Sequence, residues 1–276
     1  MQHIELTPPF RLVAGRHGFF LVSDKDTYVG HAITQYGEYG ELEWEFMRGV
    51  VQPGRDQVEV GSNIGSHTVA MGKLAAQQGR RLMAIEPQPV LFQNMCANVA
   101  LNSLFNVQTE NCACAAQAGT LSFPPQDYAA EGNFGGVAMQ VGPGAGQQVR
   151  CVTLDSLLDA SWDVGFLKID VEGFEQSVLQ GATQTIARCR PVIYLENDRI
   201  ALSKALIECI WSLGYQCWFH LPMLFNPNNF AGKTDNIFGN IASFNMLCLP
   251  NEAKHSLEQA PVQDSNHHPL HGMRGA

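Results

Sequence analysis

The sequence has no long hydrophobic run. None of its apolar segments reaches the ~18 to 20 consecutive residues that a membrane-spanning helix requires. The first five residues, Met-Gln-His-Ile-Glu, also lack the basic start and apolar stretch of a secretory signal. We therefore expect a cytoplasmic protein without a membrane span.

Positive charge is scarce. The chain has 17 Lys and Arg residues against 26 Asp and Glu residues, which gives a formal net charge of −9 and a sequence pI of about 5.4. Proteins that follow a phosphate backbone normally need a basic surface. A nucleic-acid partner is therefore not expected.

Paired cysteines are also missing. The eight cysteines never form a Cys-x-x-Cys pair, and the closest two are Cys112 and Cys114. A structural zinc site would need a second pair. We interpret the cysteines as buried, reduced thiols.

The 276 residues can form one α/β domain with additions. Apolar strand-like runs alternate with helical segments over residues 51–250, which we predict to be the main domain. Residues 1–50 read as an N-terminal cap with an edge hairpin, and the Gly- and Pro-rich residues 119–149 as a loop-rich insertion. The polar residues 251–276 are predicted to be a disordered tail.

A glycine-containing turn is the most informative stretch. Residues 58–68 read Val-Glu-Val-Gly-Ser-Asn-Ile-Gly-Ser-His-Thr and stand between a strand-like and a helix-like segment. Gly61 and Gly65 are spaced as Gly-x-x-x-Gly, with Asn63 where a dinucleotide site needs a glycine to admit pyrophosphate. Glu59 could hold an ammonium group. A nucleoside ligand with a cationic group and no pyrophosphate, such as S-adenosylmethionine, fits this pattern.

Acidic and amide side chains follow later strands. Glu86 comes 21 residues after Gly65 and ends the next apolar run, the position at which an acid can bind ribose hydroxyls. Asp170 follows the run 164–169, and Glu196 and Asn197 follow the run 191–195. Because parallel strands end at one edge of a sheet, these side chains are predicted to lie beside the nucleotide crevice.

With these motifs in view, the chain resembles the FkbM family of S-adenosylmethionine-dependent methyltransferases over about 36–250. The motifs that carry the resemblance are Tyr36-Gly37-Glu38 with Glu41, residues 59–65, Ile85-Glu86-Pro87, Asn133-Phe134-Gly135-Gly136, residues 153–157 and residues 167–175. Glu59 and Ser62 stand where the family often has Asp and Ala.

The resemblance implies a fold and a reaction. The fold is the Rossmann-like class I methyltransferase fold, a seven-stranded, mostly parallel sheet with helices on both faces. Family members typically methylate hydroxyl oxygens of sugars, glycolipids or polyketide-like natural products. The expected cofactor is S-adenosylmethionine, held by Glu59, Gly61, Asn63, Gly65, Glu86 and Asp170. The acceptor would be a hydroxyl of a small molecule or glycan, and a homo-oligomer is possible.

Two routes for the acceptor proton remain open. His220, at the end of the run 215–220, has a side chain suited to general-base work. Alternatively, Asp170 with Glu196 and Asn197 resembles the oxygen ligands with which metal-dependent O-methyltransferases bind Mg²⁺ and orient a hydroxyl. Without a metal, Asp170 would hold the cofactor or the acceptor directly.

Competing functions differ in their motifs. A nicotinamide-dependent oxidoreductase would share the sheet and the ribose acid but needs the Gly-x-Gly-x-x-Gly turn. A nucleic-acid amino-methyltransferase would carry Asn/Asp-Pro-Pro-Tyr/Phe where this chain has Asp170-Val171-Glu172-Gly173. A non-catalytic S-adenosylmethionine-binding scaffold would keep the same glycine turn, so the sequence leaves it open.

Overall fold

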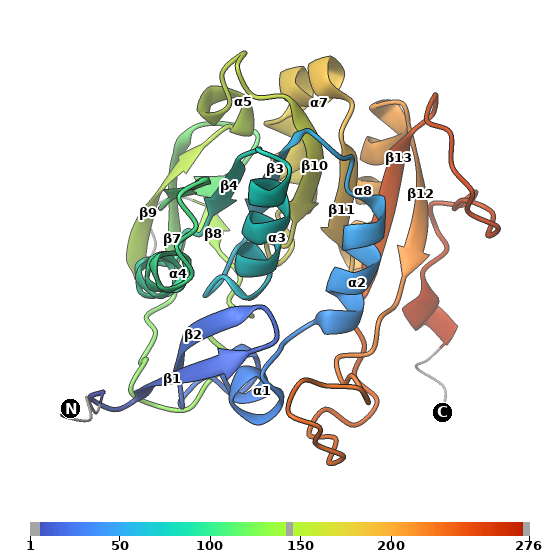
Figure 1. Cartoon of the computed structure of the whole chain (residues 1–276). Helices are drawn as coiled ribbons and strands as arrows, with labels where there is room; N and C mark the ends of the chain where they lie inside the picture. The colour runs from blue at the N-terminus through green and yellow to red at the C-terminus, as the bar shows by residue number, and fades with distance from the viewer. Residues whose placement is uncertain (1–5, 142–145, 273–276) are drawn as a thin grey trace.

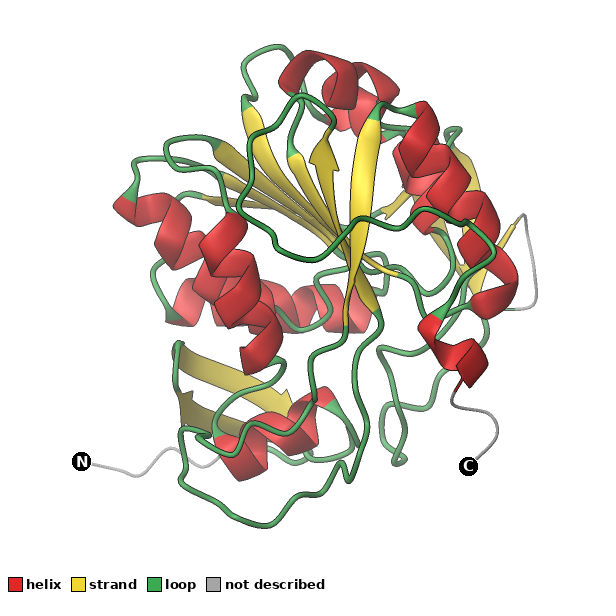
Figure 2. Cartoon of the chain, turned by 90° about the vertical axis from the view of Figure 1, so that its right-hand side faces the viewer, coloured by secondary structure: helices red, strands yellow, loops and turns green. Residues whose placement is uncertain are grey.

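The computed structural model describes residues 6–141 and 146–272. A seven-stranded sheet forms its centre, in the order β12-β13-β11-β10-β3-β4-β5 (Figures 1 and 2). The strands are β3 (Asp56–Val60), β4 (Leu82–Ile85), β5 (Val107–Glu110), β10 (Val164–Ile169), β11 (Val192–Glu196), β12 (Tyr215–His220) and β13 (Asn245–Pro250). Only β13 runs antiparallel to both of its neighbours, β11 and β12. This is the mostly parallel sheet that the class I methyltransferase fold predicts, and the fold expectation is confirmed.

Helices cover both faces of the sheet, as Figure 2 shows. One face carries α2 (Glu41–Val50), α3 (Ser66–Gln77) and α4 (Pro89–Leu101). The other carries α5 (Leu154–Leu157), α6 (Glu175–Gln180), α7 (Thr183–Cys189) and α8 (Ile200–Ser212). Both faces of a parallel sheet must be buried, which is why its strands read as continuous apolar runs in the sequence.

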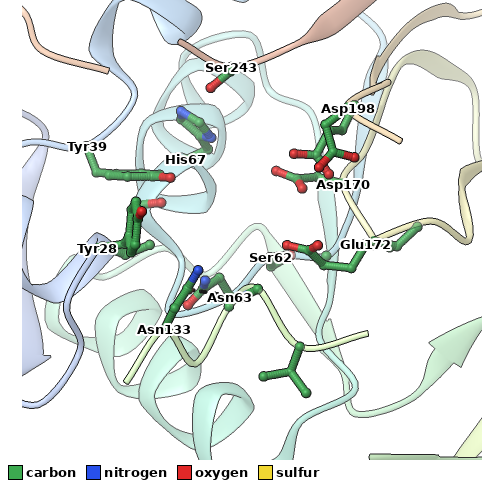
Figure 3. A pocket seen from close by; sticks show the side chains of 18 of the residues that line it. Tyr28, Tyr39, Ser62, Asn63, His67, Asn133, Asp170, Glu172, Asp198 and Ser243 are labelled. Atoms are coloured by element: carbon green, nitrogen blue, oxygen red, sulfur yellow. Dashed lines mark hydrogen bonds between the residues drawn. The ribbon is translucent and has the colours of Figure 1, made fainter. Parts of the chain in front are cut away.

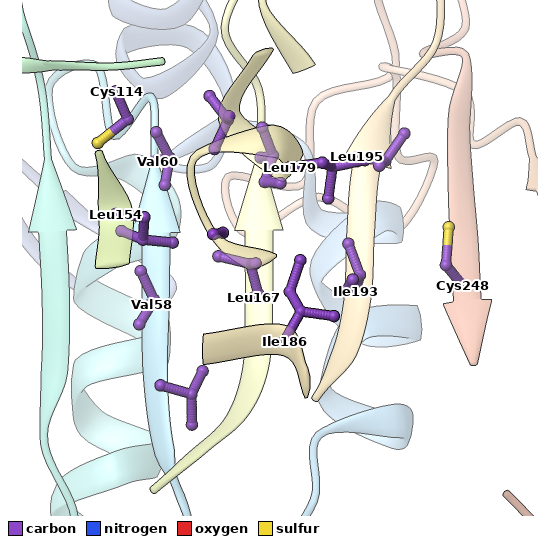
Figure 4. Packing of buried hydrophobic residues seen from close by; sticks show 14 of the residues in the cluster. Val58, Val60, Cys114, Leu154, Leu167, Leu179, Ile186, Ile193, Leu195 and Cys248 are labelled. Atoms are coloured by element: carbon purple, nitrogen blue, oxygen red, sulfur yellow. The ribbon is translucent and has the colours of Figure 1, made fainter. Parts of the chain in front are cut away.

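Alternate side chains of the central strands pack into two separate cores. Val58, Leu167 and Ile193 belong to the core beneath α6, α7 and α8 (Figure 4). Phe166 and Tyr194 point to the opposite core, beneath α2 and α3. This period-2 alternation also places Lys168 and its register partner Glu59 together on the α3 side, at the carboxyl ends of their strands.

Additional elements surround the carboxyl end of the sheet. A hairpin of β1 (Phe10–Gly15) and β2 (Gly18–Ser23) precedes α1 (Val29–Tyr36), and both lie beside the loop 221–244 at the bottom of Figure 1. A small second sheet contains β6 (Ala113–Cys114), β7 (Gly119–Phe123), β8 (Gln140–Val141) and β9 (Gln147–Val152). The predicted insertion 119–149 thus contributes most of this sheet.

The C-terminal segment differs from the sequence prediction. Residues 251–272, expected to be disordered, follow the edge strand β12 and end in the short 3-10 helix Pro269–Gly272. The indole of Trp218 donates to the Gln259 carbonyl at 2.8 Å, and His268 is buried. The polar composition of the segment does not indicate these contacts, because only a few of its side chains pack against the rest of the fold. Residues 273–276 lie outside the described part.

The eight cysteines are free thiols; six are buried as expected, and Cys96 and Cys209 are partly exposed. Within the ranges 6–141 and 146–272, no helix combines the length and hydropathy needed to cross a membrane.

Candidate functional site

A cavity of about 450 Å³ opens at the carboxyl ends of β3, β4, β10 and β11. Seven carboxyl groups line it, against a single Lys or Arg side chain, Lys168, among the described residues. The acids are Glu43, Glu59, Glu86, Asp170, Glu172, Glu196 and Asp198. The sequence analysis placed four of them, Glu59, Glu86, Asp170 and Glu196, at or next to strand ends, and the carboxyl ends of parallel strands meet at one edge.

The glycine turn brings two strand ends into contact below the cavity. Gly61 has φ +87°, and a Cβ added there would lie 1.7 Å from the carbonyl oxygen of Asp170. Gly65 has φ +84° and precedes α3, where a Cβ would lie 3.2 Å from Met95. Asn63 between them adopts φ +51°, a left-handed conformation that Asn tolerates better than most residues. The positive φ values of both glycines, and the close approach of Asp170 to Gly61, explain why these positions carry no side chain.

Glu86 is held rigidly at the end of β4. Its Oε2 accepts the backbone N–H of Asn63 at 2.8 Å, and its Oε1 accepts that of Gln88 at 2.8 Å. Burial nevertheless raises the pKa of Glu86 to about 8, against the effect of the two N–H donors. Each oxygen keeps a lone pair, so the carboxyl group can accept hydrogen bonds from a diol in the cavity.

Lys168 carries the positive charge of the site. Its Nζ lies 3.0 Å from Asp170 Oδ2 and 3.8 Å from Glu59 Oε1. Burial disfavours the charged form, but Asp170, Glu59 and Glu43 together raise the pKa of Lys168. Glu59 also accepts the Thr68 hydroxyl at 2.5 Å, so this predicted ammonium ligand is partly occupied by protein groups.

Three further carboxyl groups form an acidic cluster beside Asp170. Glu172, Glu196 and Asp198 place one carboxylate oxygen each within 4.8 Å of one another. Burial first, and then the charge of Asp170, raises the pKa of Glu196 well above its ordinary value and that of Glu172 to about 7. Arg199 pairs with Glu172 and, at 3.2 Å, with Asp198.

This arrangement changes the predicted Mg²⁺ ligand set. Asn197 turns away from the cavity, and its Nδ2 donates to Ser203 Oγ at 2.9 Å, with Met246 Sδ at 3.0 Å. Asn197 therefore does not line the cavity beside Asp170 and Glu196 in the described part of the chain. The error arises because successive residues after a strand point in different directions, which a sequence pattern does not resolve.

Aromatic side chains form the wall opposite the acids. In Figure 3, Tyr28, Tyr39 and His67 lie on one side of the cavity, and Asp170, Glu172 and Asp198 on the other. His67 stands in the first turn of α3, and its Nε2 donates to the Gly40 carbonyl at 3.2 Å. Burial, aided by Lys168, lowers the pKa of His67 to about 4, so its ring is neutral at pH 7.

His67 is a site residue that the sequence analysis missed. It lies inside the glycine-turn stretch, but the motif draws attention to the loop before the helix. The position of His67 two residues after Gly65 was the available signal, since the first turn of the helix after a nucleotide loop faces the crevice.

The position of His220 differs from the one expected of a general base. It does not belong to the described cavity lining; its ring stacks on Phe46 with a centroid distance of 3.9 Å. The Tyr194 hydroxyl accepts from Asn245 Nδ2 at 2.9 Å and donates to His220 Nδ1 at 2.7 Å. Burial lowers the pKa of His220 to about 4. The ring is therefore engaged outside the cavity and is poorly placed to act as the predicted base.

The 133–136 loop has two different roles. Asn133, Gly135 and Gly136 line the cavity, whereas Phe134 is buried in a core with Leu91. A Cβ on Gly135 would lie 2.3 Å from Asn63 Nδ2, so the loop approaches the glycine turn closely. The buried Phe134 anchors the loop and its glycines cover the ligand space.

Comparison with known proteins identifies this cavity-bearing domain. A family model described as "Methyltransferase FkbM domain" matches residues 59–217, more than half of the chain. The chain belongs to the FkbM methyltransferase family. A comparison with curated protein sequences found no match.

Solved structures give weak overall likenesses to this FkbM-family chain. An FkbM methyltransferase from Methylobacillus flagellatus shares 15% identity over 75% of this chain and 50% of that chain, with a TM-score of 0.44. This chain therefore spans half the length of that protein. A precorrin-6y C5,15-methyltransferase from Geobacter metallireducens shares 12% identity over 83% and 94%, with a TM-score of 0.47. M. jannaschii TYW2 in complex with AdoMet shares 13% identity over 90% and 88%, with a TM-score of 0.46.

Tyr36 and Glu38, upstream of the residues that the family model matches, hold a loop that lines the cavity. The Tyr36 hydroxyl donates to the Asp235 carbonyl at 2.7 Å and accepts the Ile237 N–H at 2.9 Å. Glu38 accepts from Asn226 Nδ2 at 2.8 Å and from the Phe230 N–H at 2.9 Å. Both residues therefore hold the loop 221–244, whose Leu224 and residues 241–244 line the cavity.

Proposed function

We propose that this protein transfers the methyl group of S-adenosylmethionine to a hydroxyl oxygen of a small-molecule or glycan acceptor. The observation that carries the proposal is the composition of the cavity lining, with seven carboxyl groups against one Lys among the described residues, at the carboxyl ends of parallel strands. S-adenosylmethionine has a cationic sulfonium and an ammonium group and no phosphate. A dinucleotide would bring its pyrophosphate into this acidic site, which disfavours a nicotinamide-dependent oxidoreductase.

The residues present fit the methyl donor. The cavity volume of about 450 Å³ lies within the ~300–1,000 Å³ common for small-molecule sites. Glu86 would accept the ribose hydroxyls, and Gly61, Asn63 and Gly65 would pass beneath the ligand. Glu59, shared with Lys168, would act on the ammonium end.

The apolar part of the cavity lining supports a position for the adenine ring of S-adenosylmethionine. Phe123, Val137, Met139 and Val171 line the cavity together with Glu86. A flat adenine ring gains by burial against such side chains, while the ribose stays next to the carboxyl group of Glu86. This arrangement leaves the acidic cluster and Asp170 for the other end of the ligand space.

Asp170 is the residue best placed to receive the acceptor proton. Its side chain is 42% exposed, and Lys168 occupies only Oδ2. In the proposed reaction the acceptor oxygen forms a bond to the methyl carbon as the carbon–sulfur bond breaks. The hydroxyl proton passes to Asp170, and the products are a methyl ether and S-adenosylhomocysteine. Positioning accounts for most of the catalysis, because the sulfonium is already activated.

His67 and the tyrosines would orient the acceptor from the opposite wall. The Nδ1 atom of the neutral His67 ring is an acceptor when Nε2 donates to Gly40. Tyr28 and Tyr39 supply flat surfaces on which a sugar or aromatic ring can stack. The proposal needs no Mg²⁺, because Arg199 and Lys168 already pair with the acids near the reacting oxygen.

Calorimetry and product analysis test this function. We expect S-adenosylhomocysteine to bind and NAD⁺ to show no binding to the same protein. Incubation with methyl-labelled S-adenosylmethionine and a panel of sugar and phenolic acceptors should give a methyl ether by mass spectrometry. Label found on nitrogen or carbon would contradict O-methylation, and binding without any turnover would favour a non-catalytic scaffold.

A further inference from the structure

The C-terminal segment 251–272 reaches the cavity at Leu270. This side chain is partly exposed and is not among those that pack into the hydrophobic cores of the described residues. Ile241, in the loop 221–244, also lines the cavity, is 43% exposed and lies outside the same cores. Core packing therefore does not explain either side chain. The match to the family model ends at residue 217, so family membership does not explain them either.

A buried histidine fixes the place of Leu270. His268 is 2% exposed, and its Nε2 donates to the carbonyl of Asn197, the residue after β11, at 2.8 Å. Its Nδ1 accepts the backbone N–H of Leu270 at 3.1 Å. The neutral ring with its proton on Nε2 satisfies both hydrogen bonds. The ring of Phe244 stacks on His268 with a centroid distance of 6.0 Å, which joins the segment to the loop that carries Ile241.

The topology places Leu270 on the acceptor side of the proposed reaction. In the sheet, β4 and β11 lie on opposite sides of the central pair β3 and β10. The proposed ribose ligand Glu86 follows β4, Asp170 follows β10, and Leu270 is tied to the residue after β11. In Figure 3, Ser243 of the loop 221–244 lies at one end of the cavity and Asn63 of the glycine turn at the other. A ligand group that reaches Leu270 therefore belongs to the acceptor.

We propose that Leu270 determines acceptor specificity, because it forms with Ile241 an apolar subsite for a substituent of the molecule that carries the reacting hydroxyl. This inference rests on the proposed methyl transfer, in which Asp170 receives the hydroxyl proton. An alcohol with an alkyl or aryl group gains by burying that group in the subsite, whereas an acceptor with hydroxyls on every side does not. His268 acts through Leu270 and is a positioning residue.

Ligand-observed NMR with simple alkanols as probes tests the subsite. Wild-type protein saturated with S-adenosylhomocysteine should bind 1-hexanol at least about tenfold more tightly than ethanol, because each buried methylene adds up to about fourfold. In Leu270→Gln, which places an amide in the subsite, this preference should fall below about threefold. Leu257→Gln is the matched control, because Leu257 lies in the same segment but packs against the core beneath α2 and α3. It should keep the wild-type preference.

The positioning role of His268 is tested with the same probes. His268→Ala should lose the preference as Leu270→Gln does, since the Leu270 N–H loses its acceptor. His268→Asn should restore part of it, because an Asn side chain can accept the N–H two residues further on. His267→Ala, at the exposed neighbouring position, should behave as wild type. All these variants should bind S-adenosylhomocysteine with wild-type affinity, which a general loss of structure would not allow.

The outcomes separate this inference from the proposed function. A wild-type protein that binds S-adenosylhomocysteine but shows no preference for 1-hexanol, or a preference that Leu270→Gln retains, would overturn the subsite and leave methyl transfer standing. Loss of the preference in Leu257→Gln as well would show an effect of segment folding alone and would also overturn it. A wild-type protein that binds no S-adenosylhomocysteine would overturn the proposed function and the subsite together.

A direct contact measurement decides the case in which Leu270→Gln fails to fold by circular dichroism. In wild-type protein with ¹³C-labelled leucine methyl groups, the Leu270 signals are those that disappear in Leu270→Val. These signals should show intermolecular nuclear Overhauser effects to the alkyl chain of 1-hexanol. Their absence at saturating 1-hexanol would reject Leu270 as part of the subsite.

Discussion

Replacing Glu86 by glutamine removes the carboxylate that the proposed ribose contact needs, together with one of the two backbone hydrogen bonds that the residue accepts. The carboxyl group accepts one backbone N–H on each oxygen, from Asn63 and Gln88, at 2.8 Å. Glutamine keeps one accepting oxygen and places an NH₂ group at the other position. A hydrogen bond to a charged acceptor contributes about 1.5–3 kcal/mol, so losing one ribose contact should weaken S-adenosylhomocysteine binding about 10- to 150-fold.

The protonation state of Glu86 provides a second test of the ribose contact, through the pH dependence of binding. Burial raises its pKa to about 8 in the ligand-free protein, whereas ribose hydroxyls would donate to the ionised carboxylate. Binding should therefore release a proton, and affinity should fall as pH drops below 8, by at most about tenfold per pH unit. Glu86→Gln should lose this dependence.

The same pKa predicts the stability of the ligand-free protein. Between the ordinary Glu value and about 8, folded Glu86 keeps a proton that the unfolded chain has released. The contribution of Glu86 to stability is therefore present at low pH and decreases as pH rises through this window, by at most about 1.4 kcal/mol per unit. Urea unfolding of wild type and Glu86→Gln at several pH values measures the difference.

Isothermal titration calorimetry about one unit below and one unit above the pKa of Glu86 is the decisive assay. Glu110→Gln is the matched control, because Glu110 ends the neighbouring strand and pairs with Arg150 outside the cavity. If Glu86→Gln is folded and binds S-adenosylhomocysteine with wild-type affinity at both pH values, the ribose assignment is wrong.

The other predictions concern the turn, the base and the metal. Gly61→Ala should lower the free energy of unfolding by ~3 kcal/mol or more in urea titrations. Gly79 also has a positive φ but lies in open space, so Gly79→Ala should lower it by only ~1–2 kcal/mol. Equal losses in the two variants would contradict the close approach of Gly61 to Asp170. Asp170→Asn should reduce kcat ~100-fold or more with little change in S-adenosylhomocysteine affinity. His220→Asn should reduce kcat less than ~10-fold. A larger loss of kcat in His220→Asn than in Asp170→Asn would favour His220 as the general base. EDTA treatment should leave activity unchanged, and a loss restored by Mg²⁺ would show that the acidic cluster binds a metal.

The sequence predicted most of the sheet because its central strands are buried on both sides. The predicted runs 164–169 and 215–220 match the observed bounds of β10 and β12. The acids at their ends were also predictable, since Glu86 and Asp170 each follow a strand directly. These features depend on local order along the chain, which a sequence pattern records.

Contacts between distant segments could not be predicted in this way. Tyr36 and Glu38 hold the loop 221–244 across about 190–200 positions of sequence, and the pattern around each residue indicates only a helix end. Side-chain direction was a second difficulty. Asn197 follows β11 and His220 ends β12, as expected, but neither side chain belongs to the described cavity lining. The C-terminal segment was misread because sparse anchors such as His268 hold a polar stretch.

Transfer of the labelled methyl group tests the central claim most directly. Purified protein, methyl-labelled S-adenosylmethionine and a metabolite extract of the source cells should yield a labelled product whose mass spectrum places the methyl group on oxygen. The same reaction with Asp170→Asn should give little product while S-adenosylhomocysteine still binds. A wild-type protein that binds no S-adenosylhomocysteine, or that places the label on nitrogen or carbon, would contradict the account.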